Sequence, residues 1–92
     1  MTRKKANQIY IISCGDLLKI GVTNDIDKRI KNLQTGNPKP LTLEFVQEKN
    51  NPYKVENYLH IRLQKHRIKG EWFEGITVHD IRVQLMLCTE YD

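Results

Sequence analysis

Several features that often define a class of protein are scarce or absent in this sequence. It has only two cysteines, Cys14 and Cys88, which form no CxxC pair and have no histidines at zinc-finger spacing. It lacks the run of about 20 apolar residues that a membrane-spanning helix requires and the apolar N-terminal segment of a signal peptide. These absences argue against a zinc finger and a membrane protein, and they predict reduced thiols in a cytoplasmic protein.

The chain also lacks internal repeats, low-complexity tracts and the length needed for two domains. Its 92 residues, of which 39% are apolar, are enough for one hydrophobic core of modest stability. The N-terminal residues are polar and basic. We therefore expect a flexible basic arm over residues 1–7 and a single folded domain over residues 8–92.

Basic residues exceed acidic residues, and they are unevenly distributed. Lysine and arginine number 15 against 11 aspartates and glutamates, which gives a formal charge of +4. They gather at residues 3–5, 28–31 and 62–69. Such clusters favour a polyanion, above all nucleic acid, because binding releases condensed counterions. A surplus of this size also fits an ordinary solvated surface, so charge alone does not decide between the two.

Apolar periodicity and turn residues predict an α+β fold, with a small three-stranded antiparallel sheet flanked by helices in the order ββαβαα. Strands are expected over residues 8–13, 17–23 and 41–46, where β-branched and aromatic residues or apolar alternation occur. Helices are expected from Asn24 or Asp25 to Gly36, from Asn51 to Gly70, and from Thr77 to Cys88. A further short strand is an option at Trp72.

The first two helices each carry an apolar stripe that we expect to face the core, formed by Ile26, Ile30 and Leu33 and by Val55, Leu59 and Leu63. At ~100° per residue, Arg29 and Glu56 lie roughly 60° from the centres of these stripes. Both side chains should therefore border the sheet rather than point into solvent. His60 follows Glu56 by one turn, so the two share a face.

The predicted hairpin determines which strand residues accompany them. If its loop has an even number of residues, Tyr10 lies across from Lys19 or Gly21 on the same face. A three-residue loop would reverse this parity. Gly21 would leave a gap beside the tyrosine, where a backbone or a phosphate can approach closely. We expect Tyr10, Lys19, Arg29 and Glu56 to rim one concave surface.

This set supplies the groups that hydrolysis of a phosphodiester requires. Glu56 offers hard oxygen ligands for Mg²⁺ or Mn²⁺. Arg29 can hold a phosphate through paired donors. Tyr10 can orient or deprotonate the attacking water, with Lys19 lowering the pKa of its hydroxyl. Each residue also has a purely structural interpretation: a strand aromatic, an edge-strand lysine, a helix-surface arginine paired with Asp25, and an acid in the first turn of a helix.

The order of these motifs is similar to that of a known family. QIYII, then LLKIGVTNDIDKRIKNLQTGNP, then a helical glutamate and GEWF make the chain resemble the GIY-YIG endonuclease superfamily. The likeness is closest to a phage-associated branch whose second motif reads K-[IV]-G, and it covers residues 8–74. It implies an αβ fold with a three-stranded antiparallel sheet and metal-dependent cleavage of DNA.

The resemblance also implies roles for single residues. Tyr10 matches the tyrosine of the first motif and Gly21 the glycine of the second, while Arg29 matches the catalytic arginine. Glu56 matches the metal-binding glutamate. Lys19 stands where the second motif usually has a tyrosine, so the arrangement that activates water can differ from that of the wider family.

Other positions depart from the family pattern. The usual glycine of the first motif is missing at Gln8 and Ile9. The histidine often found one turn after the arginine is Leu33 here, and His60 is a candidate substitute. An asparagine that some members use after the glutamate has no obvious counterpart, and Glu71 lies nearest by spacing.

The predicted function is that of a metal-dependent endonuclease that hydrolyses phosphodiester bonds in DNA, nicking with loose or structure-based specificity. Lys28, Lys31, Asn37 and Arg62 are expected to contact the nucleic acid. The chain has no room for a separate recognition region, so a partner protein is another source of specificity. A single compact site cuts one strand at a time, so cutting both strands would need a homodimer.

Two other functions stay open. Lys19 and Leu33 favour a catalytically inactive nuclease fold that binds nucleic acid or a partner protein without cutting. The third hypothesis is a small phage-type protein that binds and inhibits a host factor. Salt-sensitive, metal-independent binding that is indifferent to the loss of Glu56 would select the second function, and capture of a partner without nucleic acid would select the third.

Overall fold

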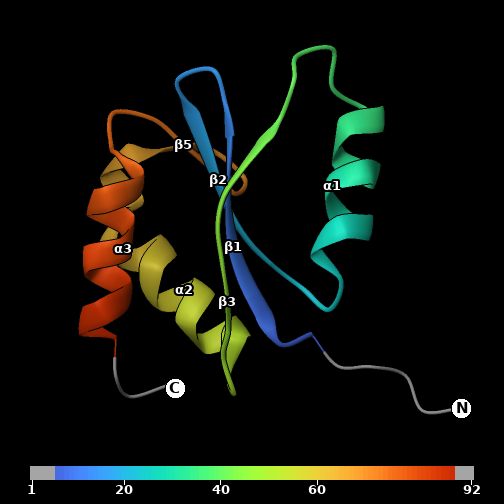
Figure 1. Cartoon of the computed structure of the whole chain (residues 1–92). Helices are drawn as coiled ribbons and strands as arrows, with labels where there is room; N and C mark the ends of the chain where they lie inside the picture. The colour runs from blue at the N-terminus through green and yellow to red at the C-terminus, as the bar shows by residue number, and fades with distance from the viewer. Residues whose placement is uncertain (1–5, 89–92) are drawn as a thin grey trace, which may run out of the picture.

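The computed structural model describes residues 6–88, and within them five strands and three α-helices form (Figure 1). The strands are β1 (Gln8–Cys14), β2 (Leu17–Thr23), β3 (Thr42–Glu48), β4 (Arg67–Lys69) and β5 (Trp72–Phe73). The helices are α1 (Ile26–Thr35), α2 (Pro52–Arg62) and α3 (Val78–Leu87), with a short 3-10 turn over Gln64–His66. The predicted α+β class is confirmed.

All pairings in the sheet are antiparallel, and the strands lie in the order β3-β1-β2-β5-β4. The three long strands are those expected from the sequence, and the short β4–β5 hairpin adds two strands beside β2. A turn at Gly15 and Asp16 joins β1 to β2, and Gly15 has a φ of 60° that suits glycine. This two-residue loop meets the even-loop condition, and of the two residues considered opposite Tyr10, Gly21 is its partner while Lys19 pairs with Ile12.

One face of the sheet carries the hydrophobic core. Side chains alternate along a strand, so those of Ile9, Ile11, Leu18 and Ile20 all point to the side covered by α2 and α3 (Figure 1). The predicted stripe of α2 and two residues of α3 join them in one buried cluster, with Val55, Leu59, Leu63, Ile81 and Leu85. Because apolar burial contributes about 25 cal/mol per Å², this cluster is the main source of stability.

The opposite face carries Tyr10, Ile12, Lys19 and Gly21, on the side where α1 lies (Figure 1). α1 covers this face incompletely, since it has no fully buried residue and its stripe of Ile26, Ile30 and Leu33 is only half-buried. The expectation that this stripe faces the core is therefore wrong in part. Two helices fill the core on the other side of the sheet, whereas a single helix lies over this face.

Helix α2 ends at Arg62 rather than at Gly70, so its predicted length is wrong. After the 3-10 turn, the chain reverses into β4 and β5, and Gly70, with a φ of 57°, lies in the turn between these strands. Pairing of β5 with β2 satisfies backbone groups at the sheet edge. The helical periodicity of residues 63–70 does not reveal this pairing, because the pairing depends on β2, which is distant in sequence.

Side chains cap two of the three helices. Asp25 accepts a hydrogen bond at 3.1 Å from a backbone amide in the first turn of α1. Thr77 and Asp80 form a reciprocal capping box at the start of α3, as their spacing predicts. Asn51 occupies the N-cap position of α2 before Pro52 but makes no side-chain capping bond. Proline at the first helical position, whose φ angle is already helical, therefore favours the start of α2 without a side-chain cap.

Three further expectations concern the N-terminal arm, the cysteines and the membrane. Within the predicted arm, Asn7 is bonded to the sheet, through its N–H to the carbonyl of Thr23 at 3.3 Å and through its carbonyl to the N–H of Lys49 at 2.8 Å. Residues 1–5 of that arm lie outside the described residues. Cys14 and Cys88 are buried and form no disulfide. Of the described helices, none has the length and apolar character needed to cross a bilayer.

Candidate active site

The candidate site lies at the edge of β2, beyond the short strand β5. β5 pairs with β2 only at Leu18 and Lys19, which leaves the backbone groups of Ile20 to other partners. The N–H of Ile20 donates to the carbonyl of Glu71 at 3.1 Å, and the carbonyl of Ile20 lies 3.3 Å from Nε2 of His60. These two contacts bring the β4–β5 turn and helix α2 to the same point of the sheet.

Tyr10 and Arg29 form the part of the site that faces α1. Tyr10 is fully buried, and its hydroxyl accepts a hydrogen bond from Nε of Arg29 at 3.2 Å. A Cβ atom on Gly21 would collide with that hydroxyl, so only glycine leaves room for it. The predicted gap, open to a backbone or a phosphate, is wrong in this form, because the hydroxyl of the tyrosine itself fills the space beside Gly21.

The environment of Tyr10 keeps its hydroxyl protonated. Burial raises the pKa of Tyr10, and the charges of Glu71 and Glu56 act in the same direction. The hydrogen bond and the positive charge of Arg29 oppose this rise in pKa without cancelling it. Tyr10 is therefore a neutral phenol at pH 7, whose oxygen accepts from Arg29 and whose O–H is a donor. Such a group is suited to orient a water molecule or a phosphate oxygen, not to deprotonate it.

Lys19 is held in a different way from that expected. Its side chain is buried, its Nζ lies 3.1 Å from Oε2 of Glu71, and the same Nζ lies 5.2 Å from the centre of the Trp72 ring. The positive charge that lowers the pKa of Tyr10 comes from Arg29 and not from Lys19. Lys19 is thus a fixed cation of the site, and the alternative of an exposed edge-strand lysine is wrong.

Glu56 reaches the site from α2. The pKa of Glu56 is raised to about 7, and burial of the side chain is the largest cause. The charge of Glu71 and a hydrogen bond between the two carboxyl groups raise this pKa further, while the charge of Lys19 lowers it. The side chain is half-buried, as its predicted position beside the apolar stripe implies. The charge of Glu56 also acts on Tyr10. The structure therefore brings together Tyr10, Lys19, Arg29 and Glu56.

Glu71 is a further member of this cluster, for which the sequence predicted no chemical role. Its charge favours a higher pKa for Tyr10, Arg29, Glu56 and His60, although burial outweighs this effect at His60 and leaves its pKa lowered. The sequence offered only a weak indication, in the spacing of GEWF after the helix. The long predicted α2 concealed it, because a helix running to Gly70 leaves no β-turn to carry Glu71 back to β2.

His60 lies near Glu56, as predicted, but its contacts are structural. Its ring packs edge-on against Phe73, with 5.0 Å between ring centres, and its Nε2 lies beside the carbonyl of Ile20. Burial lowers the pKa of His60. The ring is therefore neutral at pH 7 and helps to hold α2 against the sheet edge.

The predicted nucleic-acid contacts do not form one surface. Lys28 and Lys31 are exposed on α1, on the same side of the sheet as Arg29. The side chain of Asn37 accepts a hydrogen bond at 3.0 Å from the backbone N–H of Lys39, within the loop that follows α1. Arg62 lies at the end of α2, with its guanidinium 5.3 Å from the ring centre of Tyr58. Arg62 is thus separated from α1 by the sheet.

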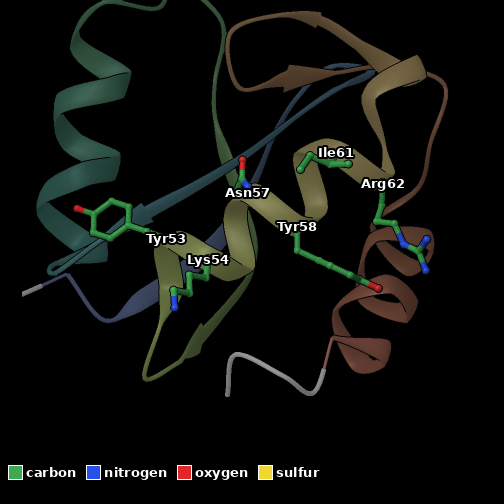
Figure 2. Close-up of a pocket in the computed structure, with 6 residues that line it drawn as sticks. All are labelled: Tyr53, Lys54, Asn57, Tyr58, Ile61 and Arg62. Atoms are coloured by element: carbon green, nitrogen blue, oxygen red, sulfur yellow. The ribbon is translucent and has the colours of Figure 1, made fainter.

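A hollow on the outer side of α2 contains Arg62 but not the clustered residues (Figure 2). Its volume is about 410 Å³, and it is lined by Tyr53, Lys54, Asn57, Tyr58, Ile61 and Arg62. Figure 2 shows that these side chains all extend from α2. The polar cluster at β2, not this hollow, contains the groups that chemistry on a phosphate requires.

The oxygen donors at the site fit a hard divalent cation. Glu56 and Glu71 offer two carboxyl groups in hydrogen-bond contact. Within residues 6–88, no set of three or more His, Cys, Asp and Glu side chains is placed to hold a metal. A Mg²⁺ or Mn²⁺ ion at these carboxyls would therefore take its other ligands from water and from a phosphate, as Mg²⁺ commonly does.

The fold is that of a small α+β domain with an antiparallel sheet and three helices, which is consistent with a nuclease-like fold. A family model, the T5orf172 domain, matches residues 7–86. The chain belongs to this family, a phage-associated domain of nuclease type. The comparisons with curated proteins and with solved structures found no match. The predicted resemblance to a phage-associated domain is confirmed at the level of this family, while nuclease activity and membership of the GIY-YIG branch stay predictions.

Proposed function

We propose that this protein is a divalent-metal-dependent endonuclease that hydrolyses phosphodiester bonds in DNA. One observation carries the proposal: four side chains from four different elements, Tyr10, Lys19, Arg29 and Glu56, meet around Gly21 at the edge of β2. The nuclease-type family to which the chain belongs agrees with it. A cluster with two cations, a phenol and a carboxyl pair matches the chemical needs of a scissile phosphate.

Arg29 is the residue suited to hold the phosphate. One of its N–H groups is bonded to Tyr10, and the other donors of the guanidinium match non-bridging phosphate oxygens. Tyr10 fixes the guanidinium and offers its O–H to the attacking water. Lys19 adds a fixed positive charge. A Mg²⁺ or Mn²⁺ ion held at Glu56 would stabilise the negative charge that develops on the leaving oxygen.

DNA in the cytoplasm is the substrate that we favour, with nicking as the outcome. Lys28 and Lys31 are exposed on the helix that carries Arg29, and their positive charges support binding of this helix to a nucleic-acid backbone. One site of this size cuts one strand. Specificity would be loose, would follow the structure of the DNA, or would come from a homodimer or a partner protein.

The test is a cleavage panel of single-stranded, duplex and branched DNA and of RNA, each with Mg²⁺ or Mn²⁺. Arg29→Ala and Glu56→Ala should lower the nicking rate by about 100-fold or more, the usual cost of removing a group that stabilises transition-state charge. Lys39→Ala and Glu48→Ala remove the same charges from exposed positions and should leave the rate unchanged. If wild-type protein leaves every substrate uncut, the proposal fails.

A second function is favoured by the neutral state of Tyr10. Burial raises the pKa of Tyr10, so its hydroxyl cannot serve as the base that deprotonates water. The other candidate for this base, a histidine one turn after Arg29 in α1, is replaced by Leu33. A protein of this kind would bind nucleic acid or a partner without cutting. Binding that is salt-sensitive, independent of metal and unaffected by Glu56→Ala, together with an absence of cleavage, would select this function.

A further inference from the structure

The position of Glu71 is fixed by its backbone. It lies in the β4–β5 turn, directly after Gly70, whose φ is 57°. The carbonyl of Glu71 accepts a hydrogen bond from the N–H of Ile20 at 3.1 Å, which attaches the turn to the edge of β2. The side chain of Glu71 is not needed for this attachment. Its carboxylate is therefore available for contacts within the site.

The carboxylate of Glu71 joins the two halves of the cluster. Its Oε2 lies 3.1 Å from Nζ of Lys19. It is hydrogen-bonded to the carboxyl group of Glu56. The same Oε2 would lie 3.1 Å from a Cβ on Gly21, the position that the hydroxyl of Tyr10 overlaps. Glu71 thus lies between the fixed cation, the carboxyl group suited to a metal, and the phenol.

We infer that Glu71 is a positioning residue of this site, whose carboxylate holds Lys19 above Trp72 and orients Glu56 towards a divalent cation. The inference rests on the proposed endonuclease function and extends it to Glu71, which belongs to the GEWF segment but not to the four predicted catalytic residues. An exposed surface acid would not have these contacts: the side chain of Glu71 is 35% exposed, and that of its partner Lys19 is 10% exposed. A residue that orients a metal ligand typically changes metal affinity 10- to 100-fold.

The first experiment measures Mn²⁺ binding to the full chain by calorimetry, without any substrate. Glu71→Gln keeps the size of the side chain and removes its charge, and we expect it to weaken Mn²⁺ binding by about 10-fold or more. Glu74→Gln is the matched control, because Glu74 lies three residues further on and its side chain is exposed. This control should bind Mn²⁺ as wild type does. Thermal unfolding of each variant reports whether it is folded.

The second experiment is a double-mutant cycle on the nicking rate at saturating metal. If Glu71 acts by holding Lys19, Glu71→Gln and Lys19→Gln are not independent, and the double variant should be about as slow as the slower single variant. Two independent residues would instead give a product of the two single effects. A multiplicative result would overturn the link between Glu71 and Lys19.

The outcomes separate this inference from the function on which it rests. If wild type nicks DNA and Glu71→Gln matches it in both nicking and Mn²⁺ affinity, the inference is overturned and the endonuclease proposal stands. If wild type cuts nothing but Glu71→Gln still weakens Mn²⁺ binding, the placement of Glu71 is supported and the endonuclease proposal fails. Wild-type protein that takes up no Mn²⁺ and also cuts no substrate would overturn both.

Discussion

The two faces of the sheet differ although they are built from the same two strands. On the face covered by α2 and α3, Ile9, Ile11 and Ile20 belong to a closed apolar cluster. On the face towards α1, the residues between them include Tyr10, Lys19 and Gly21, which contact polar and charged partners. Because strand side chains alternate, the apolar core and the strand residues of the proposed site lie on opposite sides of one hairpin. Changes on the two faces should therefore have different consequences.

The largest effect on folding is expected on the core face. Leu59 of α2 is 1% exposed, so Leu59→Ala leaves a cavity and should cost about 3 kcal/mol of unfolding free energy. That is a large part of the roughly 5–15 kcal/mol available to a small domain. Urea denaturation measures it. Arg29→Ala, on the other face, should cost far less stability while abolishing nicking, and an equal loss of stability in both variants would remove the distinction.

The next effect is expected at Gly21, where the polar face is most crowded. Gly21→Ala places a methyl group against the Tyr10 hydroxyl, and we expect a loss of about 1–3 kcal/mol together with a strong loss of nicking, since Tyr10 and Arg29 must shift. Gly36→Ala is the matched control, because nothing lies near a Cβ there and its φ is −92°. Equal stability of the two variants would contradict the close packing of Tyr10.

Helix caps on the two faces give a smaller and sharper comparison. Asp25→Ala and Thr77→Ala each remove a side-chain cap and should each cost about 1 kcal/mol in thermal or chemical unfolding. Only Asp25 caps the helix that carries Arg29. The nicking rate should fall in Asp25→Ala and stay near that of wild type in Thr77→Ala. A similar fall in both would mean that α1 does not position Arg29 separately from the core.

The smallest effect is expected in the pH dependence of stability. The folded protein has the pKa of Glu56 at about 7, above the ordinary value of 4.5, so the folded state binds more protons than the unfolded state between these pH values. Stability from this group is full below pH 4.5 and is lost as the pH rises through 7. Because Glu56 is only half-buried, the slope should be modest.

Urea denaturation in EDTA from pH 5 to pH 8 measures this slope. Glu56→Gln should flatten it, and Glu48→Gln, which changes an exposed carboxylate on β3, should not. An unchanged slope in Glu56→Gln would mean that another group titrates in this range. With Mn²⁺ present, the slope should shrink, because a cation competes with the proton for the carboxylate.

Much of the site follows from patterns of short range. The even loop after Cys14 pairs Tyr10 with Gly21, and turn chemistry at Gly15 makes that loop recognisable. The apolar stripe of α2 fixes the direction of Glu56 through helical periodicity. These features depend on residues close to one another in sequence, so local rules suffice to predict them, apart from the parity of the loop.

The contacts that escaped prediction depend on distant segments. A helix continuing to Gly70 was expected, but β4 and β5 form there because the edge of β2 offers backbone partners. The partner of Lys19 was missed for the same reason, since Glu71 reaches it only through that hairpin. The apolar stripe of α1 was expected to face the core, but α1 has no fully buried residue. The periodicity of a helix shows which of its sides is apolar and does not show which face of the sheet the helix covers.

The sequence by itself determined the α+β class, the alternation of Tyr10 with Ile9 and Ile11, and the position of Glu56 beside the apolar stripe of α2, because alternation and helical repeat act over a few residues. The parity of the hairpin loop, which sets the register, was left open by the sequence and decided by the fold. Tertiary structure alone decided that Arg29 bonds Tyr10, that Glu71 holds Lys19, and that burial raises the pKa of Tyr10 and Glu56. These outcomes depend on distances and desolvation between segments far apart in the chain, and such quantities exist only once the chain has folded.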